Sequence, residues 1–182
     1  MRAFIAIDLP EPLRAALAET QQAFRRVCPE ARWTRPEGIH LTLKFLGEIS
    51  DAQAKRVVES LTRIGKFEPI SIEARGFGFF PHPRQPRVLW VGIEAPSALG
   101  ELAARVEREM EKAGFAREER AFTPHLTLAR FPVPRPQPAL EAALPGAEPA
   151  SLGRFEASEF FLFESQLSPQ GAQYRKVVRF PR

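Results

Sequence analysis

The spacing of hydrophobic and polar positions predicts a chain in which strands and helices alternate. Apolar residues at helical spacing predict amphipathic helices over residues 11–27, 52–64 and 96–115. Short apolar or alternating runs predict strands over residues 2–9, 69–81, 87–95, 122–131, 153–165 and 174–181. Residues 31–49 predict two further strands around a turn at Pro36 to Gly38, and the proline-rich segment 132–149 has room for one short helix.

Two of the predicted strands carry the same four residues. His-Leu-Thr-Leu occurs at residues 40–43 and again at 125–128, and the chain has only 3 histidines. The two motifs are close to half a chain length apart. Each motif follows a predicted strand and a predicted helix in its own half of the chain. The repeat predicts an old duplication in one domain of residues 1–182, with two α/β lobes related by pseudo-twofold symmetry. Chance recurrence of four residues is the alternative.

The period of a strand assigns the motif residues to two faces. Residues two apart point to the same side, so His40 shares a face with Thr42, and His125 shares a face with Thr127. The leucines lie on the opposite face, where each strand can bury them in its own lobe. If the lobes face each other, both His-Thr faces meet across a central cleft.

Two opposed imidazoles suit acid/base chemistry at phosphorus. A neutral imidazole takes a proton from a nucleophile, and a protonated imidazole gives a proton to a leaving group. In-line displacement puts the nucleophile and the leaving oxygen on opposite sides of phosphorus. The hydroxyls of Thr42 and Thr127 can donate hydrogen bonds to the non-bridging oxygens. The two motifs are nearly identical, so the sequence does not decide which histidine is the acid.

Composition adds a mild preference for phosphate. The formal net charge is +4, and arginine outnumbers lysine about four to one among the 26 basic residues. The guanidinium fork suits phosphate oxygens, although a GC-rich genome also explains many arginines. No apolar run approaches the ~20 residues of a membrane helix, and the first residues do not form a signal peptide. A cytoplasmic protein is therefore expected.

A metal site is the main chemical alternative, because histidine is a common metal ligand. A catalytic zinc usually takes three protein ligands, but the third histidine, His82, stands in a proline-rich turn and no acidic cluster flanks either motif. The single cysteine, Cys28, allows neither an intrachain disulfide nor a cysteine-based zinc site, and we expect a buried or incidental thiol. The sequence therefore favours chemistry without a metal.

Several segments together resemble a known family. The paired motifs occur with "RAFIAIDLP", "LTLKFLGE", "FPHPRQPRVLWVG" and "ESQLSPQGAQYRKVVRFP". In this combination the chain resembles the RNA 2′,3′-cyclic phosphodiesterases of the 2H phosphoesterase superfamily, also called 2′-5′ RNA ligases. The resemblance covers essentially the whole chain. It departs from the family at His82, where a different polar residue is common.

The resemblance implies a fold, a reaction and two roles. The fold is α+β and bilobal, with antiparallel sheets lining a central cleft. The reaction opens a terminal 2′,3′-cyclic phosphate of RNA to a 2′-phosphate, without metal or other cofactor. By analogy alone, His40 donates a proton to the leaving 3′ oxygen and His125 accepts one from water. The reverse reaction with an RNA 5′-hydroxyl makes a 2′-5′ linkage.

Four further residues are candidates for contact with RNA. Lys44 is four positions after His40 and shares its face in a regular strand. Arg130 is five positions after His125, so it belongs on the leucine side unless it lies at the strand end and reaches round to the phosphate. Phe45 could stack on a base, and Tyr174, the only tyrosine, could serve either the site or the fold.

Other interpretations stay open at this point. A non-catalytic RNA-binding module could use the same basic cleft, and a metallohydrolase is a second alternative. The substrate could be tRNA halves, other RNA ends or small cyclic nucleotides. We expect a monomer that does not contact membranes. The sequence gives His82 no defined role, although a solvent-exposed turn residue is the simpler interpretation.

Overall fold

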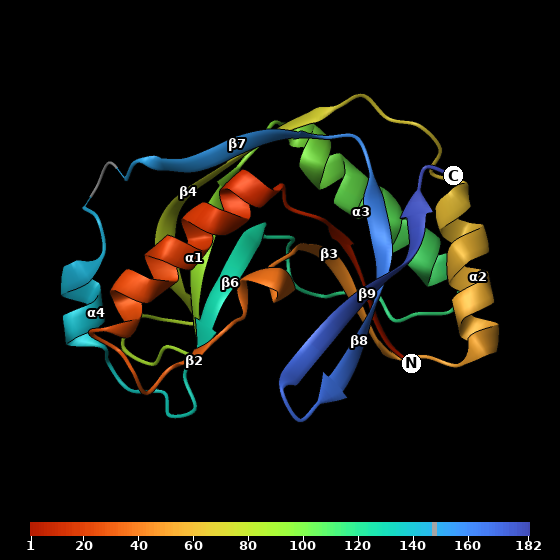
Figure 1. Cartoon of the computed structure of the whole chain (residues 1–182). Coiled ribbons are helices and arrows are strands. Elements are labelled where there is room, and N and C mark those ends of the chain that lie inside the picture. The colour runs from red at the N-terminus through yellow and green to blue at the C-terminus, as the bar shows by residue number, and fades with distance from the viewer. Residues whose placement is uncertain (147–148) are drawn as a thin grey trace.

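The computed structural model describes residues 1–146 and 149–182, and its strands form two antiparallel sheets (Figure 1). The four-stranded sheet has the order β3-β1-β8-β9 and contains β1 (Arg2–Ile7), β3 (Leu41–Glu48), β8 (Phe160–Ser168) and β9 (Gly171–Phe180). The five-stranded sheet has the order β2-β6-β5-β4-β7 and contains β2 (Arg32–Trp33), β4 (Ile70–Phe80), β5 (Val88–Glu94), β6 (His125–Arg130) and β7 (Ser151–Ala157). The α+β fold with antiparallel sheets is therefore confirmed.

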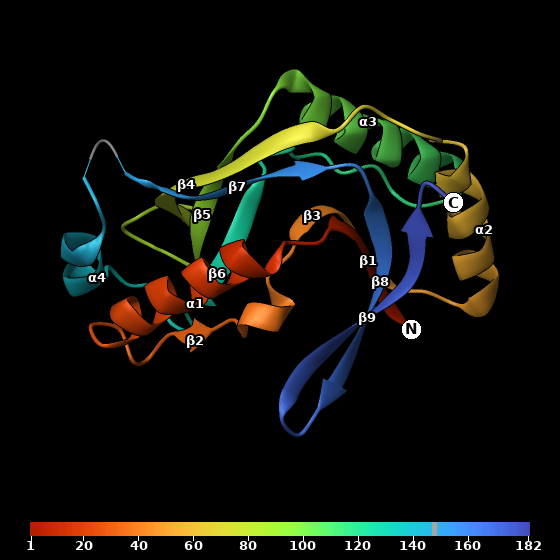
Figure 2. The same ribbon diagram turned by 45° about the horizontal axis from the view of Figure 1, so that its top comes forward.

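Two of the helices are exchanged between the two sheets, because each follows a strand of one sheet and packs on the other. The helices are α1 (Glu11–Arg25), α2 (Asp51–Thr62), α3 (Ser97–Lys112) and α4 (Pro138–Ala143), with a short 3₁₀ turn, η1 (Pro36–Gly38). Helix α1 follows a strand of the four-stranded sheet but packs against β7 of the five-stranded sheet. Helix α3 follows a strand of the five-stranded sheet but contacts β3 and α2 on the other side (Figure 2). Each sheet is thus covered by a helix that follows a strand of the other.

The three predicted long helices all form, and local signals explain their ends. At the start of α2, Ser50 and Gln53 form a reciprocal capping box, in which each side chain accepts from the other residue's backbone amide. Helix α1 begins with Pro12 in its first turn, where no amide donor is needed. Helix α3 is followed by Gly114, whose φ of 93° suits glycine best. No helix in the described ranges is long and apolar enough to cross a membrane.

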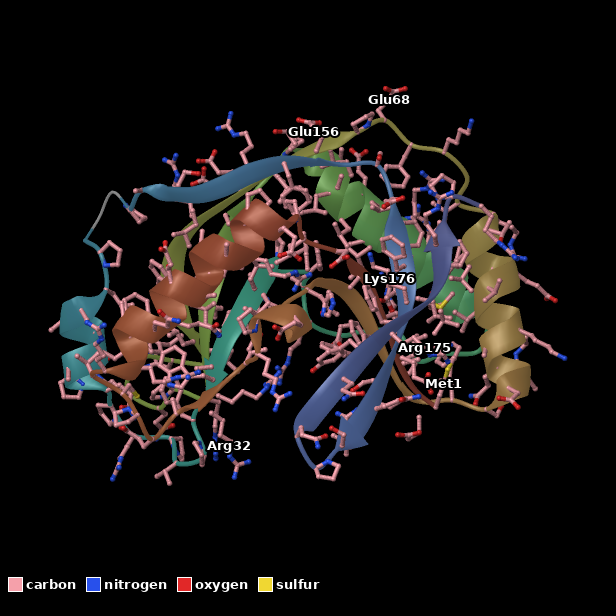
Figure 3. All side chains as sticks on the ribbon, in the orientation of Figure 1. Met1, Arg32, Glu68, Glu156, Arg175 and Lys176 are labelled. Carbon is pink, nitrogen blue, oxygen red and sulfur yellow. The ribbon has the colours of Figure 1, made fainter. Side chains whose placement is uncertain are left out.

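The prediction of one strand over residues 153–165 is wrong. The segment contains β7, which pairs with β4, and β8, which pairs with β1 in the other sheet. The chain changes sheets at Ser158 and Glu159, where neither glycine nor proline marks a break. Strand β8 then forms a long hairpin with β9, which carries the adjacent residues Arg175 and Lys176 (Figure 3).

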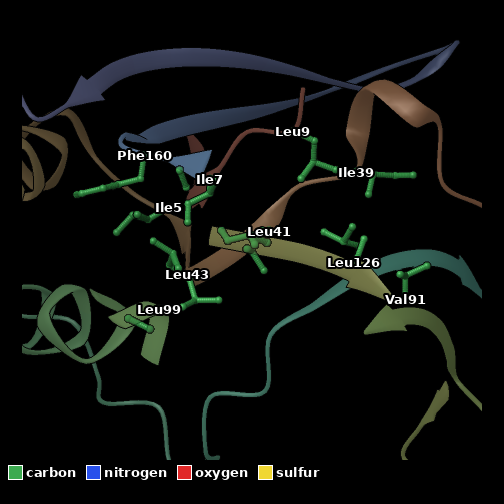
Figure 4. Close-up of a cluster of buried hydrophobic side chains, with 14 of the residues drawn as sticks. Ile5, Ile7, Leu9, Ile39, Leu41, Leu43, Val91, Leu99, Leu126 and Phe160 are labelled. Atoms are coloured by element: carbon green, nitrogen blue, oxygen red, sulfur yellow. The ribbon is translucent and has the colours of Figure 1, made fainter. Parts of the chain in front are cut away.

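One large hydrophobic cluster joins the two sheets, and a smaller cluster is formed by Phe4, Ala6, Phe161 and Phe163. The large cluster contains Leu41 and Leu43 from the first motif and Leu126 and Leu128 from the second. Figure 4 shows Leu41 and Leu126 extending toward this shared core from their two strands. The expectation that each strand buries its leucines in its own lobe is therefore wrong, because the exchanged helices and the motif strands close one continuous interior.

Candidate active site

The chain reaches the first motif by leaving one sheet and entering the other. In the β2–β6 pair Arg32 lies opposite Arg130, and the Thr34 amide then donates to the Leu128 carbonyl at 2.9 Å. The chain next forms η1 and enters β3 at Leu41. The segment that introduces the first motif is thus hydrogen-bonded to the strand of the second, and β3 contacts β6.

The two histidines are held by equivalent backbone contacts. His40 Nδ1 lies 3.1 Å from the carbonyl oxygen of Gly38, and His125 Nδ1 lies 2.8 Å from the carbonyl oxygen of Thr123. Because a carbonyl can only accept, we assign the proton of each neutral ring to Nδ1. Nε2 of each ring can then accept a proton, and it donates one when the ring is protonated.

The first motif strand contains a bulge at its second leucine. In the β1–β3 pair Ala6 lies opposite Thr42 and Ile5 lies opposite Lys44, so Leu43 is the extra residue. The bulge reverses the alternation of side chains along β3. Lys44 therefore points to the face opposite Thr42, and Phe45 returns to the face of Thr42.

The second motif strand has a bulge at the corresponding leucine. In the β5–β6 pair Trp90 lies opposite Thr127 and Leu89 lies opposite Ala129, so Leu128 is the extra residue. Ala129 is buried, and Arg130 returns to the face of Thr127. The structural counterpart of Phe45 is thus Arg130.

The placement of Lys44 on the face of His40 is wrong, because the bulge turns its side chain into the protein. Lys44 Nζ is buried and lies 2.7 Å from Glu107 Oε1 and 3.0 Å from the carbonyl oxygen of Ala116. Its charge is satisfied by these contacts between β3, α3 and the segment after α3. Lys44 is therefore not available for contact with RNA.

A cavity of about 550 Å³ lies where the two motif strands approach each other. It is lined by one histidine, both motif threonines and the three remaining candidates for contact with RNA, namely His40, Thr42, Thr127, Arg130, Phe45 and Tyr174. His125 is half-buried on the same face of β6 as Thr127, with Phe80 edge-on at 4.9 Å between ring centroids. The cavity thus gathers groups from both halves of the chain.

His40 lies in an aromatic environment and is 8% exposed. Its ring centroid is 4.4 Å from that of Phe163, 5.2 Å from Tyr174 and 5.5 Å from Phe4. Burial, followed by the positive charge of Arg14, lowers the pKa of His40 to about 4. His40 is therefore neutral at pH 7 in the unliganded protein.

The three remaining candidates for contact with RNA differ in their settings. Phe45 is 70% exposed at the rim of the cavity, so its ring is free to contact a ligand. Arg130 is exposed at the end of β6, as the strand-end interpretation requires. Tyr174 packs over Gly38, where a Cβ atom would lie 2.6 Å from the tyrosine ring. Tyr174 therefore stabilises the turn that holds His40 as well as lining the cavity.

The remaining histidine and the cysteine lie elsewhere. His82 is exposed in a turn, where its Nδ1 accepts a hydrogen bond from the Arg84 amide at 3.1 Å. Cys28 is buried beside Gln137, so the expectation of a buried thiol is confirmed. Within residues 1–146 and 149–182, no three His, Cys, Asp or Glu side chains are grouped as metal ligands would be.

Sequence reasoning missed several residues of this region. The cavity is also lined by Arg2 and Phe4 of β1 and by Ser165 and Leu167 of β8. Arg2 and Phe4 have the spacing of one strand face, but the partner of β1 was needed to identify that face. A further missed residue, Arg14, is buried on α1, where a helix pattern offers no sign that an arginine reaches the site.

Comparison with known proteins identifies the family. The family model described as "LigT like Phosphoesterase" matches residues 7–90 and again residues 91–174, with one His-Leu-Thr-Leu motif in each segment. The RNA 2′,3′-cyclic phosphodiesterase of Methanothermobacter thermautotrophicus is 35% identical over 182 residues, covering 99% of this chain and 98% of its own. The enzyme of the same name from Archaeoglobus fulgidus is 33% identical, covering 99% of both chains.

Solved structures show the same fold. The crystal structure of TT0787 from Thermus thermophilus has a TM-score of 0.81 and 32% identity, and it covers 99% of this chain and 97% of its own. The crystal structure of Escherichia coli LigT complexed with 3′-AMP has a TM-score of 0.79 and 27% identity, covering 98% and 96% of the two chains. The chain belongs to the LigT-like phosphoesterase family.

Proposed function

We propose that this protein hydrolyses the terminal 2′,3′-cyclic phosphate of RNA to a 2′-phosphate, using His40 and His125 as acid and base and no metal. The observation that carries the proposal is the pair of equivalent imidazoles, each with Nδ1 on a backbone carbonyl and Nε2 free to exchange a proton. The names of the relatives support the substrate, because several are RNA 2′,3′-cyclic phosphodiesterases.

In the proposed reaction the two rings act on opposite sides of phosphorus. His125 takes one proton from water, and the water oxygen bonds to phosphorus. The bond from phosphorus to O3′ breaks, and His40 gives its proton to O3′. The products are a 2′-phosphate and a free 3′-hydroxyl, and the rings return to their starting states through solvent. The hydroxyls of Thr42 and Thr127 and the guanidinium of Arg130 hold the non-bridging oxygens, where charge develops.

The low pKa of His40 places a condition on this assignment. A proton donor must be protonated when substrate is bound, whereas His40 is neutral at pH 7 in the unliganded protein. An anionic phosphate in the cavity favours the imidazolium and raises the pKa of His40. Protonation of His40 is therefore coupled to substrate binding. The opposite assignment, with His40 as the base, is the direct alternative.

The proposed substrates include more than one kind of molecule with a terminal cyclic phosphate. The cavity has a volume of about 550 Å³, and its exposed Phe45 and Tyr174 offer aromatic surfaces to the base of a terminal nucleotide. tRNA halves ending in a cyclic phosphate and small cyclic nucleotides both carry the required group. The same site run backwards, with an RNA 5′-hydroxyl in place of water, forms a 2′-5′ linkage.

A direct test uses a labelled RNA oligonucleotide that ends in a 2′,3′-cyclic phosphate. We expect the purified monomeric protein to open the ring with EDTA present and to produce a 2′-phosphate, which ³¹P NMR distinguishes from a 3′-phosphate. His40→Ala and His125→Ala should each lower the rate by about 10²- to 10⁴-fold while RNA binding is kept. His82→Ala is the matched control, because it removes the exposed histidine outside the cavity.

Each contrary result favours a different alternative. A 3′-phosphate product would overturn the proposed direction of ring opening. Loss of activity in EDTA that is restored by a divalent metal would support a metallohydrolase. A protein that binds RNA but opens no cyclic phosphate, with or without metal, would support a non-catalytic binding module.

A further inference from the structure

Arg14 is a buried arginine whose guanidinium makes two contacts with the backbone just before His40 and one with Asp8. Its Nη1 donates to the carbonyl oxygen of Pro36 at 2.5 Å and to that of Ile39 at 3.0 Å. Its Nη2 donates to Asp8 Oδ1 at 2.5 Å. Arg14 is 8% exposed, so these contacts replace the water that a guanidinium needs.

The two carbonyl contacts enclose the backbone that holds the catalytic imidazole. Pro36 begins the η1 turn, and Ile39 immediately precedes His40. Between them lies Gly38, whose carbonyl oxygen faces His40 Nδ1. A planar guanidinium that binds a carbonyl on either side of Gly38 fixes the direction of the Gly38 carbonyl, and with it the orientation of the ring.

Asp8 holds Arg14 in place from the end of β1. One carboxylate oxygen of Asp8 accepts from Arg14 and from the Leu9 amide, and the other faces Lys176 Nζ at 2.5 Å. Burial alone would raise the pKa of Asp8, but the hydrogen bond from Lys176 and the charge of Arg14 outweigh it and lower that pKa. Asp8 is therefore ionised at neutral pH and orients the guanidinium.

The second motif has a different support. In the segment before His125, the exposed Thr123 hydroxyl donates to the Ala121 carbonyl at 3.4 Å. Thr123 also supplies the carbonyl that faces His125 Nδ1. Two motifs of identical sequence therefore differ in their surroundings, since a buried guanidinium contacts the turn before His40 and an exposed threonine hydroxyl contacts the segment before His125.

We propose that Arg14, oriented by Asp8, is a positioning residue that fixes the η1 turn and so holds His40 as the Nδ1–H tautomer with Nε2 directed to the cavity. The part of this inference that concerns reaction rate rests on the proposed function. The part that concerns the imidazole does not, because its tautomer and its titration can be measured without a substrate.

Two charged groups besides Arg14, namely Asp8 and Lys176, affect the pKa of His40. His40 also borders a second cavity of about 430 Å³. The titratable and charged groups that line this cavity come from the end of β1, from α1, from η1 and from β9, and they are Asp8, Glu11, Arg14, Glu37, Tyr174, Arg175 and Lys176. Among them, Arg14 and Lys176 disfavour the imidazolium, and Asp8 favours it. Removing the charge of Arg14 while keeping Asp8 should therefore make His40 easier to protonate.

The test compares Arg14→Gln, Arg14→Lys and the control Arg105→Gln. Arg105 is a half-buried arginine on α3 that donates to the Ile64 carbonyl, remote from the cavity. Steady-state kinetics on the cyclic-phosphate RNA give kcat and KM. Nitrogen-15 NMR of the histidine rings gives the tautomer and the titration midpoint of His40, with His125 as an internal reference.

We expect Arg14→Gln to lower kcat by about tenfold or more and to leave KM within about threefold. The neutral ring of His40 should populate the Nε2–H tautomer, and its titration midpoint should rise by about one pH unit. Arg14→Lys keeps the charge but not the planar fork, so the midpoint should stay near that of the wild type while the tautomer becomes mixed and kcat falls less. His125 should be unchanged in every variant, and Arg105→Gln should match the wild type.

A folded Arg14→Gln protein with the wild-type tautomer of His40 and the wild-type kcat would overturn the proposal. If Arg14→Gln does not fold, Arg14→Lys provides the test. A wild-type tautomer of His40 together with a wild-type kcat in Arg14→Lys would also contradict the proposal. A wild-type protein that opens no cyclic phosphate refutes the proposed function alone, because the NMR measurements still test the role of Arg14.

Discussion

Leu43 of β3 and Leu128 of β6 are equivalent bulged residues in strands of different sheets, and each is the last residue of a His-Leu-Thr-Leu motif. Each bulge lets the threonine and the residue three positions after it share one face, although a regular strand would separate them. The cavity therefore receives Phe45 on one side and Arg130 on the other. The two motifs therefore supply the same candidate catalytic groups to the site but different neighbours to the cavity.

Replacing Lys44 by methionine should destabilise the fold without affecting substrate contacts. The change leaves the Glu107 carboxylate without its ammonium partner in a largely buried setting. We expect the free energy of unfolding to fall by about 3 kcal/mol, measured by urea denaturation. Lys55→Met, at an exposed position on α2, is the matched control and should have little effect. A Lys44→Met protein of normal stability that binds RNA poorly would contradict this assignment.

Replacing Phe45 by alanine should weaken substrate binding and leave stability nearly unchanged. Its ring is 70% exposed, so removal should change the free energy of unfolding by less than about 0.5 kcal/mol. Loss of a stacked base should weaken RNA binding by about 1 to 3 kcal/mol, measured by titration with a labelled RNA. Phe131→Ala is an informative contrast, because that ring is 3% exposed and its loss should cost about 3 to 5 kcal/mol of stability. Unchanged RNA affinity in Phe45→Ala would exclude stacking there.

Replacing Arg130 by glutamine should weaken RNA binding and reduce its dependence on salt. An arginine that contacts phosphate releases counterions on binding, so its loss should lower the slope of log K against log salt by about one. The measurement is RNA affinity across a salt series. Arg63→Gln removes an exposed arginine just after α2 that pairs with Glu109, and this control should keep the wild-type slope. An unchanged slope in Arg130→Gln would exclude a phosphate contact.

The paired motifs allowed much of the candidate site to be predicted from sequence. Histidine and threonine two positions apart share a strand face wherever the strand lies, so the local geometry around His40, Thr42, His125 and Thr127 needed no knowledge of the fold. The wrong placement of Lys44 also has a local cause, which is the bulge in β3. A bulge adds one residue to the count, and neither leucine in the motif indicates which of them is extra.

Other features depended on contacts between distant parts of the chain. The apolar pattern of α1 predicted a helix, but it did not reveal that the helix packs on the other sheet. Arg14 lies on the buried stripe of α1 with Leu17, Gln21 and Phe24, where an arginine is unusual. Its contacts with Pro36 and Ile39 arise only when the η1 turn is placed against α1. The exchange of helices between sheets is therefore what brings this guanidinium to His40.

The stability of the protein should depend on pH through His40. Burial and the charge of Arg14 lower the pKa of His40 to about 4 in the folded protein, whereas an unfolded histidine titrates near about 6.5. Between these values the unfolded chain takes up a proton that the folded chain does not, so stability rises with pH. The stabilisation is fully present above about pH 6.5 and is lost as the pH falls toward about 4, by an amount on the order of 3 kcal/mol.

The contribution of His40 can be isolated by comparing the wild type with His40→Gln in urea denaturation between about pH 4 and pH 8. Carboxylates with lowered pKa values, such as Glu109 and Glu164, also lose their stabilising effect in acid, but they are present in both proteins and cancel in the difference. His82→Gln should follow the wild type, because that ring is exposed in its turn. Parallel curves for the wild type and His40→Gln over this range would show that the aromatic surroundings of His40 do not disfavour its protonation.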